Sequence, residues 1–496
     1  MVGRLRNTLS VLAERSRHHR GFLVVLVVAA VLWAIVFQTA CIDFVAEGSR
    51  PFRASWLGNG QISLFGYTLP YNLEGWADHD YFYISWADQF LSGHLPYADR
   101  FEVQEINDWV YYQPYFLPPL FLYVCVLGRV LPIQPFGIGL VLTLFGYLTT
   151  FPIYGIAVQL SERNAIGIAS SATYLFNPVI LYYTVFQWLN PAPFVFFVML
   201  SFYFLIKGSR TAGLLSMVTA AFFKQIALFF ALPLIASILV PSKKHNGDSS
   251  NFTIKQPDFS SFSRATKISL CYAILLSIPY ILNPLSYLGF IFGHIGSVHL
   301  SDYSTLPGPN RPITVAVLFI LFGAPEGLVQ IIDFLQSSSL LLILGVVPVF
   351  WSMLRSGELG ADNQDYWKHI LFLSLLMIFW VHIFSPRGIF KYYTVALIPF
   401  VCLLPSNRAL SRKSERTLSP FCIINPILFS VLILIPDRNL YIAFLLFALL
   451  LYAIFGYRDK WVSLVSGIYY KRNRMKSSIV STNATLQVPY SSSQFS

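Results

Sequence analysis

Long apolar runs, separated by short charged segments, dominate the chain. The stretch 21–42 carries no ionisable side chain apart from the thiol of Cys41. A helix of about 20 apolar residues is long enough to cross the ~30 Å hydrocarbon core of a bilayer. The other uncharged stretches are 165–206, 334–354, 392–407 and 439–457. The pattern therefore predicts a polytopic integral membrane protein.

Polar loops, and breaks such as Asn177-Pro178 and Asn190-Pro191, divide these runs into predicted helices. The apolar part of 313–333 is too short to span, so we expect this segment to be re-entrant or interfacial. These assignments predict an all-α polytopic membrane fold of about twelve transmembrane helices, with interfacial helices in the first outer loop. The expected spans are 21–42, 115–132, 136–160, 166–185, 191–207, 212–241, 268–292, 334–354, 367–386, 390–405, 421–436 and 439–457.

Basic residues indicate the orientation of these helices. The first twenty residues contain five arginines, and the positive-inside rule keeps that end in the cytoplasm. The apolar run that follows is too long for a typical removed signal peptide, so we interpret it as a signal anchor. The resident membrane could be the plasma membrane of a prokaryote or the endoplasmic reticulum. The predicted organisation is a cytoplasmic N-terminus 1–20, a transmembrane domain 21–457 with outer loops 43–112 and 293–333 and a cytoplasmic loop 242–266, and a cytoplasmic, partly disordered tail 458–496.

Composition excludes a soluble protein and argues against several partners. The chain is 55% hydrophobic and only 11% charged. Its net charge of +11 is spread over the termini and short loops rather than over one domain, so we expect no nucleic-acid partner. The five cysteines lack metal-ligand spacing, and we expect no cofactor and no metal site, although a divalent metal is compatible with the residues.

Two aspartates, Asp78 and Asp80, open the most informative part of the first outer loop. Apolar residues then recur at helical spacing until Gly93, which predicts an interfacial helix. A carboxylate there can act as a general base, but an aspartate can also simply cap the first amides of a helix. We expect Asp80, directly at the helix start, to be the cap and Asp78 to be the base. For Asp88 and Asp99 a solvated loop charge is at least as good an interpretation.

This loop resembles the first luminal loop of the GT-C superfamily of membrane glycosyltransferases, particularly polyprenol-phosphate-mannose-dependent mannosyltransferases. The resemblance implies a general base in the acidic motif and a surface for the sugar and the lipid head group, to which Tyr81, Asp99 and Arg100 would belong. The segment from Arg100 to Tyr111 is longer than the compact loops of that pattern. The matching residues are Asp78, Asp80 and Tyr81, then Gly93-His94-Leu95-Pro96-Tyr97, then Tyr111 to Pro114 and Leu117 to Leu120.

Two later basic segments are also similar to this superfamily. Lys224 lies inside an apolar run, like the lysine-bearing helix of many bacterial and archaeal members, and a charge at membrane depth is costly unless it is functional. We expect it to face phosphate; the alternative is a side chain that snorkels to the interface. In the turn around Arg387 and Lys391, Arg387 could hold phosphate bidentately and Lys391 could add a point charge. The alternative is that this turn serves only as an interfacial anchor.

The resemblance implies an inverting glycosyltransferase. It would move mannose or another hexose from a polyprenyl-phosphate-linked donor to a lipid, glycan or protein acceptor at the outer or luminal face of the bilayer. No cytoplasmic segment is long enough to bind a nucleotide sugar, which favours a lipid-linked donor. Two alternatives remain: a transporter or flippase of lipid-linked saccharides, which would place ionisable residues in broken midplane helices, and a polymerase or ligase of surface polysaccharide.

Overall fold

The computed structural model describes most of the apolar part of the chain. By backbone contacts the chain divides into two units, Met1–Leu445 and Leu446–Ser496, and every side-chain contact discussed below lies in the first unit. The described residues are 2–47, 59–64, 67–72, 76, 78–97, 105–106, 109–110, 115, 117–239, 258–280, 284–293, 314–359, 363–386, 388–408, 421–434 and 438–456.

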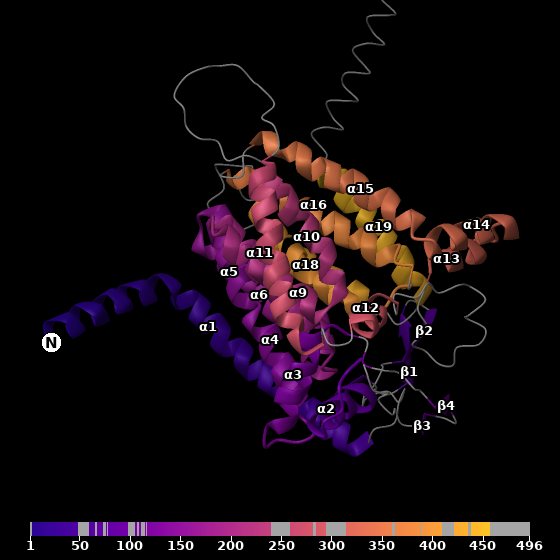
Figure 1. The fold of residues 1–496 in the computed structure, drawn as a ribbon, viewed down its shortest axis with the longest axis horizontal. Helices are drawn as coiled ribbons and strands as arrows, with labels where there is room; N and C mark the ends of the chain where they lie inside the picture. Colours follow the sequence, from indigo (N-terminus) through magenta and orange to yellow (C-terminus); the bar gives the residue numbers. More distant parts are fainter. Residues whose placement is uncertain are drawn as a thin grey trace, which may run out of the picture. The chain divides into compact units, whose positions relative to one another are not determined.

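The described residues are almost entirely helical (Figure 1). The N-terminal part contains α1 (Val2–Glu47), the π-helical turn η1 (Asp78–Ile84), α2 (Ser85–Leu91), α3 (Pro119–Val130), α4 (Gly137–Leu148), α5 (Thr150–Ser161), α6 (Asn164–Leu175), α7 (Pro178–Ile180), η2 (Leu181–Phe186), α8 (Pro191–Ile206), α9 (Arg210–Phe223), η3 (Gln225–Ala227) and α10 (Leu228–Leu239). The C-terminal part contains α11 (Phe259–Ser277), η4 (Ile278–Tyr280), α12 (Pro284–Gly293), α13 (Ala316–Leu321), α14 (Glu326–Ser337), α15 (Leu340–Arg355), η6 (Ser356–Leu359), α16 (Gln364–Ile383), η7 (Lys391–Ala396), α17 (Ile398–Arg408), α18 (Phe421–Ile433) and α19 (Arg438–Gly456).

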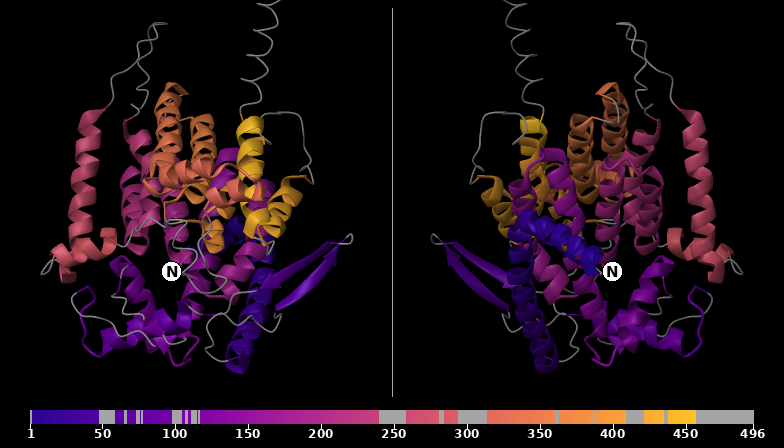
Figure 2. Two further views of the ribbon diagram at one scale, coloured as in Figure 1. Left: turned by 90° about the vertical axis from the view of Figure 1, so that its right-hand side faces the viewer. Right: turned by 90° about the vertical axis from the view of Figure 1, so that its left-hand side faces the viewer.

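Among the described residues, strands occur only in the first outer loop. β1 (Asn59–Leu64) pairs antiparallel with β2 (Tyr67–Asn72), with Asn59 opposite Asn72. Figure 2 shows the two strands lying side by side as a hairpin. β3 (Glu105–Ile106) pairs antiparallel with β4 (Trp109–Val110). These short hairpins are an addition to the all-α architecture expected from the sequence, which the helices otherwise confirm.

Several helices are long and apolar enough to cross a membrane. Among the described residues, three pass on length and hydropathy: Arg20–Ala46, Gly137–Ser161 and Gln364–Ile383. Two bent helix pairs also pass when each is taken as one span, namely α6 with the helix Pro178–Phe186, and α14 with α15. The shorter apolar helices are Pro119–Val130, Pro191–Ile206, Arg210–Phe223, Gln225–Leu239, Lys391–Leu403, Ile424–Ile433 and Leu440–Ile454.

The predicted span 212–241 is two antiparallel helices. The α-helix stops at Phe223, and the extended backbone of Lys224 (φ −158°, ψ 132°) separates α9 from η3 and α10. Where α10 ends, the carbonyl of Leu239 accepts a hydrogen bond of 3.2 Å from the amide of Asp258, and Arg210, at the start of α9, interacts electrostatically with Asp258. The chain therefore returns to the end from which α9 started.

The predicted span 115–132 is also different in the structure. At the start of α3 the Tyr97 hydroxyl donates to the carbonyl of Leu117 (2.5 Å), and at its end Arg129 pairs with Asp88. Both ends of α3 therefore contact the first outer loop, and α3 packs beside α2.

Small residues allow close packing of the helices that surround the first outer loop. Gly139 of α4 lies so close to the ring of Trp188 that an added Cβ would come within 2.5 Å of it. The Trp33 indole of α1 donates to the carbonyl of Leu175 at the end of α6 (2.8 Å). Close approach through glycine and side-chain bonds to backbone carbonyls are the usual ways in which membrane helices associate.

Candidate active site

The acidic motif opens a short helix at one end of the helical core. η1 begins at Asp78, so the helix opens at the two aspartates, and Asp78 and Asp80 both lie in its first turn. The amide of Asp80 donates to the carbonyl of Trp76 (3.0 Å), and the Trp76 indole donates to the carbonyl of Phe186 at the end of η2 (2.6 Å). The expectation that Asp80 marks the helix start is therefore wrong, and position alone does not make Asp80 the cap.

The helix that follows ends where the sequence predicts. α2 ends at Leu91, and Gly93 takes the left-handed conformation (φ 91°) that few residues other than glycine adopt easily. The amide of Gly93 donates to the carbonyl of Phe90, and that of His94 donates to Gln89 (both 3.0 Å).

His79 anchors this helix to the segment between α3 and α4. Its ring is fully buried, and Nε2 lies 3.1 Å from the carbonyl oxygen of Pro135. Burial lowers the pKa of His79 to about 4, because desolvation disfavours the imidazolium, although the bond to Pro135 acts in the opposite direction. The ring packs at 4.9 Å from that of Trp188. His79 is therefore a neutral structural residue at neutral pH, which sequence reasoning did not assign.

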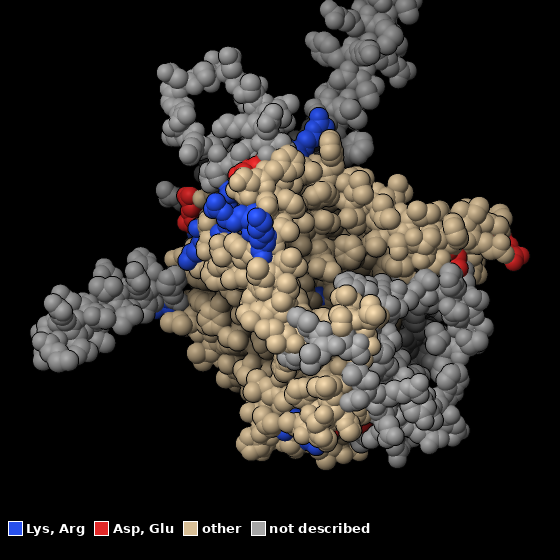
Figure 3. All heavy atoms as spheres, viewed as in Figure 1, with Lys and Arg blue, Asp and Glu red and all other residues tan. Residues whose placement is uncertain are grey.

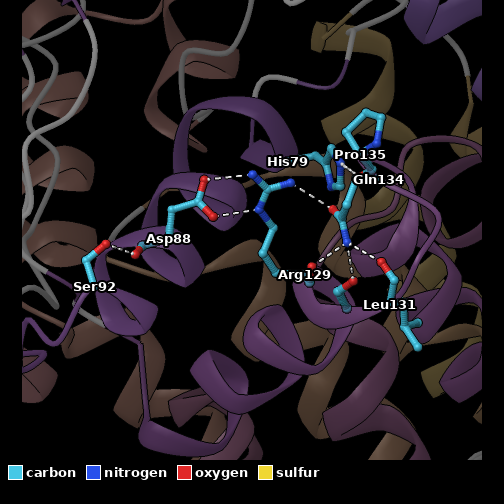
Figure 4. Close-up of polar contacts among 8 residues, drawn as sticks. His79, Asp88, Ser92, Arg129, Leu131, Gln134 and Pro135 are labelled. Atoms are coloured by element: carbon cyan, nitrogen blue, oxygen red, sulfur yellow. Dashed lines mark hydrogen bonds and ion pairs between the residues drawn. The ribbon is translucent and has the colours of Figure 1, made fainter.

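Asp88 is partly exposed and is held in an ion pair with Arg129. Arg129 donates from Nε to Asp88 Oδ1 (2.6 Å) and from a terminal nitrogen to Oδ2 (3.1 Å), and it also donates to Gln134 (2.9 Å; Figure 4). Gln134 in turn donates to the carbonyls of Gly128 (3.0 Å) and Leu131 (2.7 Å). Asp88 thus ties α2 to the end of α3.

Lys224 is buried at the break between α9 and η3. Its exposed fraction is 4%, so the side chain does not snorkel to the surface of the described part. Its Nζ donates to Asn190 Oδ1, and it lies 4.2 Å from the ring centre of Tyr393 and 5.1 Å from that of Tyr392. The ammonium is thus held by an amide oxygen on one element and by aromatic faces on another.

Asp78 belongs to the same neighbourhood as Lys224. The carboxylate interacts electrostatically with the hydroxyls of Tyr83 and Tyr392. Burial raises the pKa of Tyr83 well above its usual value and Asp78 raises it further, while Asn190 acts in the opposite direction. Tyr392 therefore neighbours both Asp78 and Lys224, and Asn190 binds Lys224 and interacts with Tyr83, which joins three segments far apart in the sequence.

Lys391 faces a different aromatic ring. Its Nζ lies 5.2 Å from the ring centre of Tyr441 in α19, whose hydroxyl lies 2.8 Å from Nε2 of His382 in α16. His382 in turn packs edge-on against Tyr393, with 6.4 Å between ring centres. Lys391 and Lys224 thus flank a continuous set of rings formed by Tyr441, His382 and Tyr393.

The remaining predicted site residues are only partly placed. The backbone of Tyr81 lies in η1, but its side chain lies outside the described residues, as do Asp99, Arg100 and Arg387. Among the described residues, no group of three or more His, Cys, Asp or Glu could hold a metal ion. The neighbours of Lys224 to which no role is assigned from the sequence are Asn190, Tyr392 and Tyr393; Asn190 was visible only as part of a helix break, and the two tyrosines only as part of the turn around Lys391.

Charged side chains on the view of Figure 3 gather at the opposite end of the helices, over α11. The exposed basic residues of α11 are Arg264 and Lys267. Lys207 and Arg210, at the turn between α8 and α9, lie at this same end, because Arg210 interacts with Asp258 at the start of α11. By the positive-inside rule we take this as the cytoplasmic end, which leaves Asp78 and Lys224 toward the outer face.

Comparison with known proteins gives only a distant structural likeness. No protein-family model matches the sequence, and neither does any curated protein. Among solved structures, the chain is similar to ArnT from Cupriavidus metallidurans bound to undecaprenyl phosphate, with 14% identity and a TM-score of 0.40, covering 87% of this chain and 76% of that one. The apo state of the same protein gives 14% identity and 0.40, covering 86% and 77%. A likeness of this size does not establish a family.

Proposed function

We propose that the protein is a membrane glycosyltransferase of the GT-C type that takes its sugar from a polyprenyl-phosphate donor at the outer or luminal face. The observation that carries the proposal is the shared neighbourhood of Asp78 and Lys224. Asp78 interacts electrostatically with Tyr392, whose ring centre lies 5.1 Å from the buried ammonium of Lys224, although the two charged residues come from segments far apart in the chain. Glycosyl transfer from a lipid phosphate requires these two groups, a base for the acceptor and a cation for the leaving phosphate.

The proposed reaction is a single displacement. The acceptor hydroxyl oxygen forms a bond to the anomeric carbon while the bond from that carbon to the phosphate oxygen breaks, so the configuration inverts. Asp78 accepts the hydroxyl proton, and the ammonium of Lys224 stabilises the negative charge that develops on the departing lipid phosphate. Low local dielectric strengthens this attraction, because Lys224 is almost fully buried.

The finer assignments belong to the same proposal. The donor sugar is mannose or another hexose, and the acceptor is a lipid, a glycan or a protein. Lys391, Arg387 and Arg100 add positive charge for the phosphate, while Tyr81 and Asp99 contact the sugar or the acceptor. The resident membrane is the plasma membrane of a prokaryote or the endoplasmic reticulum.

One structural feature favours the alternative of a transporter or flippase. The helix pair α9 and α10 is interrupted at a charged residue, and broken helices with ionisable residues at the break are typical of secondary transporters. A transporter, however, gives no role to a carboxylate in the outer loop beside that break, so we prefer the transferase.

The experiment that separates the two is a transfer assay. Purified protein is incubated with a panel of polyprenyl-phosphate sugars and candidate acceptors, and products are identified by mass and by the anomeric configuration of the new bond. We expect transfer with inversion that Lys224→Met weakens by raising the KM for the donor. Movement of a lipid-linked saccharide across vesicles without any sugar transfer would contradict the proposal.

A further inference from the structure

Two asparagines stand directly before prolines at the starts of α7 and α8, and only one of their side chains caps its helix. Asn177, before Pro178, caps α7: its Oδ1 accepts a hydrogen bond from the amide of Val179 (3.0 Å). Asn190, before Pro191, stands at the same position of α8, yet its side chain makes no cap hydrogen bond. Asparagine is among the best capping residues, so the departure at Asn190 needs another explanation.

The oxygen that would cap α8 binds Lys224 instead. Asn190 Oδ1 accepts the hydrogen bond from Lys224 Nζ, and Asn190 is itself buried with an exposed fraction of 7%. The opposite side of the ammonium faces the rings of Tyr393 and Tyr392, at 4.2 Å and 5.1 Å from their centres. An amide oxygen and two aromatic faces orient a cation without adding a formal charge.

The turn that carries Asn190 is tightly fixed. Trp188 has a positive φ of 55°, a conformation that costs energy for any residue other than glycine, and its side chain is fully buried against Gly139. The amide of Leu189 donates to the carbonyl of Tyr183 (3.0 Å). A strained, buried turn of this kind persists only when the surrounding structure determines it, and here it sets the position of Asn190.

We propose that Asn190 is a positioning residue that holds the Lys224 ammonium for the phosphate of the lipid donor, and that its neutrality is required. This inference rests on the proposed function. A carboxylate at this position would bind Lys224 more strongly and would repel an anionic ligand at the same place. The site therefore needs an amide that resembles a carboxylate in shape but lacks its charge.

The test compares binding of undecaprenyl phosphate with binding of undecaprenol, which lacks the phosphate, to purified protein in detergent. Wild-type protein should bind the phosphate more tightly than the alcohol. Asn190→Asp should weaken binding of undecaprenyl phosphate by about tenfold or more, roughly 1.4 kcal/mol, and leave undecaprenol unchanged. Asn190→Ala should weaken it less, while its thermal stability falls below that of Asn190→Asp.

A merely structural role predicts the opposite order, because Asp is nearly isosteric with Asn and would keep the contact to Lys224. Asn177→Asp is the matched control, since it is the same substitution before a proline but at a residue that contacts Ser430 and not Lys224. The Asn177→Asp variant should prefer undecaprenyl phosphate over undecaprenol to the same extent as the wild type.

Three outcomes distinguish failure of the inference from failure of the proposed function. If Asn190→Asp keeps the wild-type preference while Lys224→Met loses it, the positioning role is wrong and the phosphate role of Lys224 stands. If both variants keep the preference, Lys224 does not bind the phosphate. If the wild type shows no preference for the phosphate over the alcohol, the polyprenyl-phosphate donor itself is excluded, and the inference with it.

Discussion

At the scale of single residues, the chemistry depends on which carboxylate meets the buried cation. Asp78 and Asp80 are indistinguishable by sequence type, but Asp78 interacts with Tyr83 and Tyr392, and Tyr392 lies under the Lys224 ammonium. The sequence could identify both acids and the lysine, because apolar context makes charged residues conspicuous. It could not assign Asn190 or Tyr393 to the surroundings of Lys224. An asparagine before a proline is explained by a helix start, and a tyrosine in an aromatic turn is explained by packing.

Asp78→Asn should lower sugar transfer by roughly 10²-fold or more, because the amide keeps the shape of the carboxylate but loses its proton affinity. Thermal stability should change little. Asp80→Asn serves as the comparison, with the same substitution in the same helical turn and a smaller expected loss. Initial rates at saturating donor measure the effect, and near-normal rates in both variants would remove the acidic motif from the reaction.

His79 should make the fold sensitive to acid. Its pKa falls from about 6.5 to about 4 on folding, so the unfolded chain binds the proton more readily. Its stabilising contribution is complete above pH 6.5 and is lost as the pH falls toward 4, by on the order of 3 kcal/mol at about 1.4 kcal/mol per pKa unit.

Melting temperatures between pH 7 and pH 4 would test the role of His79. His79→Gln, which cannot be protonated, should lower stability at pH 7 and flatten the acid-dependent loss. An unchanged slope in this variant would show that other groups cause the acid sensitivity.

At the scale of elements, two errors of sequence interpretation have one cause. Hydropathy measures how apolar a segment is and carries no information about what its ends contact. α3 is apolar enough to be read as a span, yet Tyr97 and the Asp88–Arg129 pair fix both its ends to the outer loop. The run 212–241 is continuous in hydropathy, but it is split by the extended backbone of Lys224.

The Asp88–Arg129 pair should stabilise the packing of α2 on α3. Both side chains are partly exposed, so Asp88→Asn or Arg129→Gln should each cost only about 1 kcal/mol. The double variant should be no less stable than Arg129→Gln alone, because that substitution already removes the ion pair together with the bond to Gln134. Lys368→Gln is the control: it breaks the ion pair with Asp365 within α16, and we expect no measurable change. Melting temperatures that add fully across the cycle would mean that the two residues do not interact.

At the scale of the whole molecule, the structure and the sequence predict opposite sidedness for the chain between α3 and α10. Six predicted crossings before 242 place residue 133 in the cytoplasm and residue 209 outside. The structure favours the reverse for both, because both ends of α3 contact the first outer loop and the chain turns back at Lys224 between α9 and α10. The reversed arrangement moves Arg163, Lys207 and Arg210 to the side of the other basic loops, in better agreement with the positive-inside rule.

Single cysteines probed with an impermeant thiol reagent on intact cells or sealed vesicles decide between these topologies. The background must lack native cysteines, since Cys271 is exposed. We expect Ser92→Cys and Ile133→Cys to react from the outer face, and Ser209→Cys and Thr266→Cys to react only after the membrane is opened, because all four side chains are exposed in the structure. Ser92 and Thr266 have the same sidedness in both topologies and act as controls. Reaction of Ser209→Cys from outside together with protection of Ile133→Cys would restore α3 as a crossing, and it would separate Asn190 from the face on which sugar transfer is proposed.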